Sequence, residues 1–149
     1  MNTKNKLLIA GSAVLAFVLL TGFRGGHFGG PRDPERVKQM ITWRMDDRLE
    51  DLNATEQQKQ AIHGLKDSLF EDGKRLYEEN KGARAQMLEQ WDSANPDSRA
   101  VHALVDARVD AFRAFAHKVA DAALQAHRIF TPEQRQQLTA NVREHMNGR

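Results

Sequence analysis

Hydrophobic and polar positions divide the chain into one uninterrupted apolar run and a longer region of helical periodicity. The apolar run covers residues 7–23 and follows Lys4 and Lys6, which is the order of charge and hydrophobicity found in a secretory signal. Residues 24–33 are rich in glycine and proline, a composition that supports neither helix nor strand. We therefore expect a signal peptide or N-terminal anchor over 1–23, followed by a flexible linker. No A-x-A triplet follows the run, so cleavage and anchoring both stay open.

From residue 34 onward, apolar residues recur every three or four positions, the period of a helix with one buried side. The pattern predicts helices over about 34–52, 56–92, 98–129 and 132–146. The residues expected on their buried sides are Val37, Met40, Ile41, Met45, Leu49 and Leu52 in the first, Ile62, Leu65, Leu69, Leu76, Met87 and Trp91 in the second, and Val101, Val105, Phe112, Phe115, Val119 and Ala122 in the third.

The five residues between the two long helices are few enough to make those helices antiparallel neighbours. Residues 34–147 are therefore expected to form one all-α domain, a long antiparallel helical hairpin flanked by two short helices. A single hairpin buries only one thin seam, so we predict that the chain pairs with a second copy as a homodimer. Gly73 and Gly82 interrupt the second helix at about 1 kcal/mol each relative to alanine. They mark either a bend or close helix contact, or a tolerated imperfection on an exposed face.

Two of the helices begin with the same capping pattern. Thr55 and Gln58 precede and open the second helix, and Thr131 and Gln134 do so for the fourth. In each copy the threonine hydroxyl can accept a bond from a backbone N–H of the first turn, and the glutamine can reach back to the threonine. The sequence therefore predicts two capping boxes.

Charge and composition exclude several classes of function. Lys4 and Lys6 are two of 22 lysines and arginines, so the rest of the chain carries 20 basic against 20 acidic residues, without the net field of a nucleic-acid binder. The chain has no cysteine, which removes disulfides, thiolate metal sites and lipid-modified cysteine. It also has no phosphate-binding loop and no G-x-S-x-G elbow. We therefore expect no enzyme, no cofactor and no nucleic-acid partner.

The candidate metal ligands are weak. His63, His102 and His117 each have an aspartate four positions later, and each such pair shares a helix face. Two ligands make a poor site because zinc usually takes four, so no metal is expected and an exposed ion pair is the simpler interpretation.

The repeated T-x-x-Q pattern, together with an export signal, four helices and no cysteine, resembles the Spy/CpxP family of periplasmic proteins, whose hallmark is a doubled L-T-x-x-Q motif. The resemblance runs from about Met40 to Leu138, and Ala54 and Phe130 replace the leucine of the motif. It implies an elongated, curved dimer of helical hairpins and an ATP-independent chaperone for unfolded or aggregation-prone envelope proteins under stress. It also implies an alternative, an accessory that binds a metal or an envelope sensor kinase.

The expected client-binding residues lie in the first helix. They are Met40, Trp43, Arg44, Met45 and Arg48, which mix flexible apolar groups with basic ones. The methionines can equally pack onto the hairpin, whereas Trp43 falls off the main apolar stripe. The expected location is the periplasm, with a tether to the inner membrane, and hence a membrane contact, only if the N-terminal segment is retained.

Overall fold

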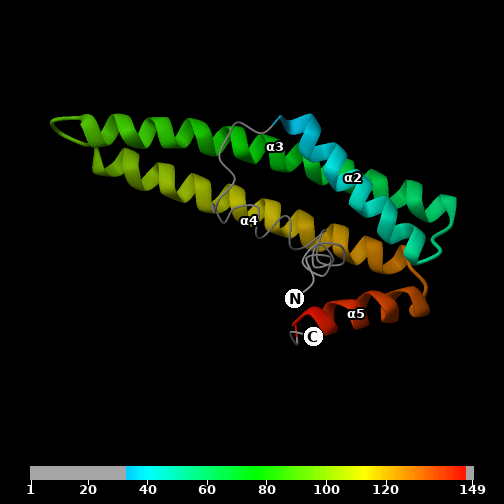
Figure 1. The fold of residues 1–149 in the computed structure, drawn as a ribbon. Coiled ribbons are helices and arrows are strands. Elements are labelled where there is room, and N and C mark those ends of the chain that lie inside the picture. The colour runs from blue at the N-terminus through cyan, green and yellow to red at the C-terminus, as the bar shows by residue number, and fades with distance from the viewer. Residues whose placement is uncertain (1–32, 147–149) are drawn as a thin grey trace. The chain divides into compact units, whose positions relative to one another are not determined.

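The computed structural model describes residues 33–146, all but a few of which lie in four helices (Figure 1). These are α2 (Pro34–Asp51), α3 (Glu56–Asp92), α4 (Ser98–Ile129) and α5 (Pro132–Met146). The predicted all-α class is confirmed, and the helix boundaries agree with those expected from the sequence to within one residue. The expected signal segment and all of the expected linker except Asp33 lie outside the described residues.

Local side-chain chemistry explains where the helices begin and end. The Asp33 carboxylate accepts a bond from the backbone N–H of Glu35 at 3.1 Å, and Pro34 occupies the first position of α2. Asp97 starts α4 in the same way, accepting from the N–H groups of Arg99 and Ala100. Asn53, with φ of 50°, takes the left-handed conformation that commonly ends a helix and turns the chain from α2 into α3.

The described chain forms two compact units, and the first contains residues 33–67 and 119–146. Its core brings together the second half of α2, the start of α3, the end of α4 and one side chain of α5, with Ile62 only 1% exposed. The core residues are Met45, Leu49, Leu52, Ile62 and Phe130, with Ala54, Leu65, Ala126, Ile129 and Leu138 packed around them. This core surrounds the two places where one helix ends and the next begins, so it holds both capping boxes.

The second unit contains residues 68–118, which are the distal part of α3, the connecting loop and the first part of α4. Leu69, Leu76 and Phe115 are its buried apolar residues. Two ion pairs cross between its helices, Arg108 with Glu79 at 3.2 Å and Lys118 with Asp72 at 2.8 Å. Two helices alone can cover only one stripe on each other, which leaves further apolar residues in contact with solvent.

Four residues expected on buried sides are exposed in the structure, three of them in this second unit. Trp91 is 84% exposed and Met40, Val105 and Phe112 are each at least 40% exposed. The sequence periodicity marks an apolar stripe wider than the single seam that one neighbouring helix covers. In residues 33–146, no helix is long and apolar enough to cross a membrane.

Candidate functional site

Both predicted capping boxes are present, with nearly the same geometry. At the start of α3, the Thr55 N–H donates to Gln58 Oε1 at 2.9 Å and the Gln58 N–H donates to Thr55 Oγ1 at 3.2 Å. At the start of α5, the corresponding distances between Thr131 and Gln134 are 2.9 and 3.3 Å. Each box satisfies two backbone donors that the helix leaves without a partner.

The two glutamines also bind each other, although 76 residues separate them. Gln58 Nε2 donates to Gln134 Oε1 at 2.9 Å, and Gln134 Nε2 donates to Gln58 Oε1 at 3.2 Å. Each Nε2 also donates to a backbone carbonyl next to the opposite box, Gln58 to Ile129 at 2.8 Å and Gln134 to Leu52 at 3.1 Å. We call these reciprocal contacts of Gln58 and Gln134 the glutamine clasp.

Each amide of the clasp uses its full hydrogen-bonding capacity. Both N–H groups of each Nε2 find an acceptor, and each Oε1 accepts one bond from its own threonine N–H and one from the other glutamine. The backbone N–H of Thr55 or Thr131 can only donate, so the side-chain atom facing it must be oxygen, which determines the orientation of both amides. With Gln134 only 9% exposed, the clasp is a fully satisfied polar network at the edge of the core.

Further side chains join α5 to its neighbours around the clasp. Arg135 Nη1 donates to the carbonyls of Phe130, at 2.6 Å, and His127, at 3.1 Å, which satisfies the end of α4. Gln137 Nε2 donates to the carbonyl of Asp51 at 3.2 Å, at the end of α2. Together with the clasp, these bonds form a structural joint between helix ends.

The expected client-binding residues divide into exposed and buried members. Trp43 is 67% exposed and Met40 is 45% exposed, and Arg44 is half-buried on the same helix. Met45 is 7% exposed and belongs to the core, which agrees with its place on the apolar stripe and not with a role in client binding. Arg48 lies 3.5 Å from Asp51 in an ion pair, at the end of α2 that packs on the core.

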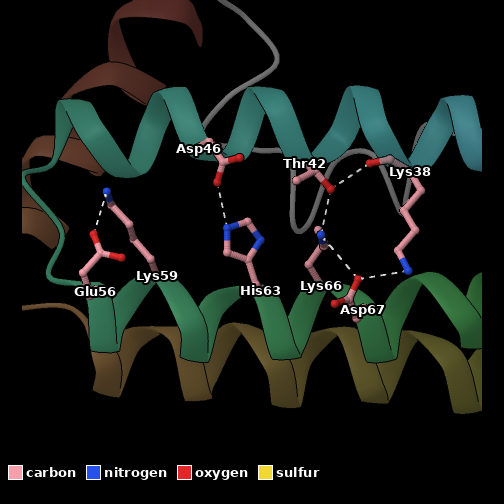
Figure 2. Close-up of polar contacts among 8 residues, drawn as sticks. All are labelled: Lys38, Thr42, Asp46, Glu56, Lys59, His63, Lys66 and Asp67. Carbon is pink, nitrogen blue, oxygen red and sulfur yellow. Dashed lines mark hydrogen bonds and ion pairs between the residues drawn. The ribbon is translucent and has the colours of Figure 1, made fainter.

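Beneath this surface, a layer of polar contacts joins α2 to α3 (Figure 2). His63 Nε2 lies 2.7 Å from Asp46 Oδ1, and Lys66, which is 8% exposed, donates to Thr42 Oγ1 at 2.7 Å. The sequence did not indicate that His63 would contact Asp46 or that Lys66 would contact Thr42.

Asp67 completes this layer. Its Oδ1 atom lies 3.4 Å from Lys38 Nζ and 3.3 Å from Lys66 Nζ. Burial alone would raise the pKa of the Asp67 carboxyl, but the two ammonium groups outweigh it and hold the pKa below its usual value. The buried ammonium of Lys66 is therefore compensated by a carboxylate that stays ionised.

The suggested histidine and aspartate pairing is wrong for His63, whose partner is Asp46 of α2 rather than Asp67. Asp67 lies instead beside the ammonium groups of Lys38 and Lys66, whose charges attract its carboxylate. His102 and His117 are exposed on α4. Within residues 33–146, no three histidine or acidic side chains converge in a way that could hold a metal ion.

Sequence reasoning found both capping boxes but not the clasp that links them. One signal for it is present in the motif itself: both copies carry glutamine at the third helical position, where glutamate would cap equally well. Glutamate has no N–H groups, so only glutamine can also donate to the opposite box. The repeated choice of the amide is what indicates a second role.

A model of the family described as LTXXQ motif family protein matches residues 40–142, which include both capping boxes and the clasp. No curated protein and no solved structure shows a significant match. Because the matched region is well over half of the chain, the protein belongs to the LTXXQ motif family, the family that includes Spy and CpxP.

Proposed function

We propose that the protein is an ATP-independent chaperone that binds unfolded or aggregation-prone envelope proteins under stress. Membership of the LTXXQ family supports the broader part of this proposal, a periplasmic stress protein like Spy or CpxP. The proposal includes no catalytic step and no cofactor, since client binding by many weak contacts requires neither.

The observation that carries the proposal is the exposed face of α2. Arg36, Met40 and Trp43 follow one another at spacings of four and three, so they share one side of the helix, with Arg44 beside them. Tryptophan is the residue that most often dominates binding energy at protein interfaces, and here two thirds of its surface is open to solvent. Methionine adapts to partners of varied shape, and the arginines can bind acidic client groups.

The opposite side of α2 is firmly held, which makes this exposed face a stable surface. Met45 and Leu49 pack into the core, and Thr42 and Asp46 contact α3 through the polar layer (Figure 2). A helix fixed in this way presents Trp43 without ordering a flexible segment, so a client meets a preorganised surface.

The test is suppression of aggregation of a chemically denatured model protein, without nucleotide. The Met40→Ser and Trp43→Ser double variant should lose most of the activity, because it removes the apolar part of the α2 face. Leu124→Ser is the matched control, since Leu124 is 58% exposed in the same unit but lies on α4. Unchanged suppression by the double variant, or no suppression by the natural protein at several-fold molar excess, would reject the proposal.

Self-association is the second part of the proposal. Val105 and Val109, both close to half exposed, lie one turn apart on α4 and form an apolar strip that a second copy could cover. Sedimentation should show a dimer at micromolar concentration, and Val109→Glu should shift it toward monomer. A natural protein that sediments as a stable monomer would contradict this part.

The proposed location is the periplasm, with release or anchoring decided by cleavage after the apolar run. N-terminal sequencing of the mature protein distinguishes the two outcomes. If crosslinking in cells instead captures one sensor kinase in stoichiometric amount, the accessory role that the family resemblance also implies would replace the general chaperone role.

A further inference from the structure

The first unit carries a depression that neither the capping boxes nor the α2 face uses. It lies between the end of α4 and one side of α5, and its volume is about 500 Å³. That size falls in the range of small-molecule sites, roughly 300–1,000 Å³. The depression is therefore large enough for a charged group with an organic substituent.

Basic side chains dominate its polar lining. Arg135 and Arg143 lie two turns apart on the same side of α5, and His127 faces them from the last turn of α4. Gln136 adds an amide, whereas Pro132 and Ala140 add apolar surface. We call the site lined by these residues the basic depression.

One of the arginines is already held in place. Arg135 Nη1 donates to the carbonyls of His127 and Phe130, so the N–H groups of Nη2 and Nε remain to donate to a ligand. Thr139 also lines the depression, but its hydroxyl donates to the Arg135 carbonyl at 2.9 Å and is not free to donate to an anion. The donors available to a ligand are therefore chiefly those of the arginines and the histidine.

None of the described residues that line the basic depression is acidic. Glu133 lies two positions before Arg135 on α5. Its carboxylate interacts chiefly with its own backbone N–H and with the Thr131 hydroxyl, which lower its pKa, with a smaller contribution from Arg135. None of the ion pairs between described residues includes Arg143 or His127. Among the side chains that the structure describes, no lining carboxylate therefore neutralises the positive charge of the depression.

We propose that the basic depression binds a phosphate group, with Arg135 and Arg143 meeting its oxygens and His127 adding a ring N–H. Two guanidinium groups at one site match the charge of a phosphate better than that of a single carboxylate, and their planar donors fit its oxygens in pairs. Pro132 and Ala140 supply apolar surface for an organic substituent of the phosphate. The phosphate can come from a free ion or small ester, or from the headgroup of a lipid.

The test uses the full chain and two probes. Inorganic phosphate is titrated at constant ionic strength, with sodium chloride as the reference, and binding is followed by nuclear magnetic resonance. Flotation with phosphatidylglycerol vesicles is compared with flotation with phosphatidylcholine vesicles. The apolar N-terminal run can insert into both kinds of vesicle, so only the difference between them reports on a headgroup.

Arg143→Gln is the variant of choice, because Arg135 caps α4 and its loss would disturb the fold. Arg84→Gln is the control, since it removes the same charge from an exposed position of α3 in the other unit. Arg143→Gln should weaken phosphate binding about tenfold, the usual effect of one lost charge-assisted bond, and Arg84→Gln should change it less than twofold.

The outcomes distinguish the sources. Phosphate binding that needs Arg143, without a preference for phosphatidylglycerol, supports a free ion or small ester. A preference for phosphatidylglycerol that disappears in Arg143→Gln supports a lipid headgroup. If neither probe binds, or if the two variants weaken binding equally, the proposal is overturned. Neither result depends on chaperone activity, so the two proposals fail independently.

Discussion

Replacing Gln134 by glutamate separates the capping role of this residue from its role in the clasp. A glutamate at the third helical position still accepts from the Thr131 N–H, so the capping box of α5 is retained. It has no N–H groups, however, and so loses the bonds to the carbonyl of Leu52 and to Gln58 Oε1. Those two oxygens would then face a carboxylate at a position that is 9% exposed in the natural protein.

The magnitude follows from the bonds lost. A hydrogen bond contributes about 0.5–1.5 kcal/mol net, and a buried polar group left without a partner costs about 1–3 kcal/mol. Two lost bonds with partial access to water give an expected loss of about 2–4 kcal/mol in the free energy of unfolding at neutral pH. Gln137→Glu is the matched control, because it adds the same charge to α5 and loses one exposed bond, to the carbonyl of Asp51.

Urea unfolding followed by circular dichroism measures both variants. We expect Gln137→Glu to cost less than about 1 kcal/mol, as for a single exposed bond. If Gln134→Glu lowers the free energy of unfolding no more than Gln137→Glu does, the clasp adds no stability beyond that of the capping box. A double-mutant cycle with Gln58→Ala and Gln134→Ala should also give a coupling of about 0.5–3 kcal/mol, the range for residues in one network.

Three further predictions concern packing and charge. Gly82→Ala should raise the free energy of unfolding by about 0.5–1 kcal/mol in urea unfolding, because no heavy atom lies within 4 Å of the added methyl group and glycine weakens a helix; a loss would reveal a close contact there. Met45→Ala should lower the free energy of unfolding by about 2–4 kcal/mol, whereas Trp43→Ala should change it by less than about 0.5 kcal/mol. Equal effects would contradict the assignment of Met45 to the core and Trp43 to the surface. The hydrogen bond from Lys118 is the main reason that the pKa of Asp72 lies below its ordinary value. This carboxylate therefore stabilises the fold above the ordinary pKa, and the contribution is lost as pH falls through the lowered pKa. The free energy of unfolding, measured against pH, should fall less steeply in acid for Asp72→Asn, and an identical fall would rule out this contribution.

The helix boundaries could be predicted because the signals that set them are local. An aspartate followed by proline starts α2, a threonine with a glutamine three positions later starts α3, and the same pair starts α5. Each signal acts within one turn of helix, where the chain itself holds the partners close together. Sequence patterns of this kind need no knowledge of the fold.

The extent of burial could be predicted only in part. Met45 and Met40 both fall on the apolar stripe of α2, yet Met45 is 7% exposed and Met40 is 45% exposed. Periodicity gives the direction in which a side chain points, but the neighbouring helices decide how much of the stripe is covered. The same limit explains why Trp91 and Val105 are exposed on the long helices.

The capping boxes and the clasp separate most clearly what depends on local sequence from what depends on tertiary structure. The sequence alone determined an all-helical domain, its helix ends and two separate capping boxes, because each depends on residues within four positions of one another. Only the tertiary structure decided that Gln58 and Gln134 bind each other, that His63 contacts Asp46, and that Lys66 is buried beside Thr42. These contacts join helices that are distant in sequence, and the packing of the core, rather than any local preference, sets the distances between them.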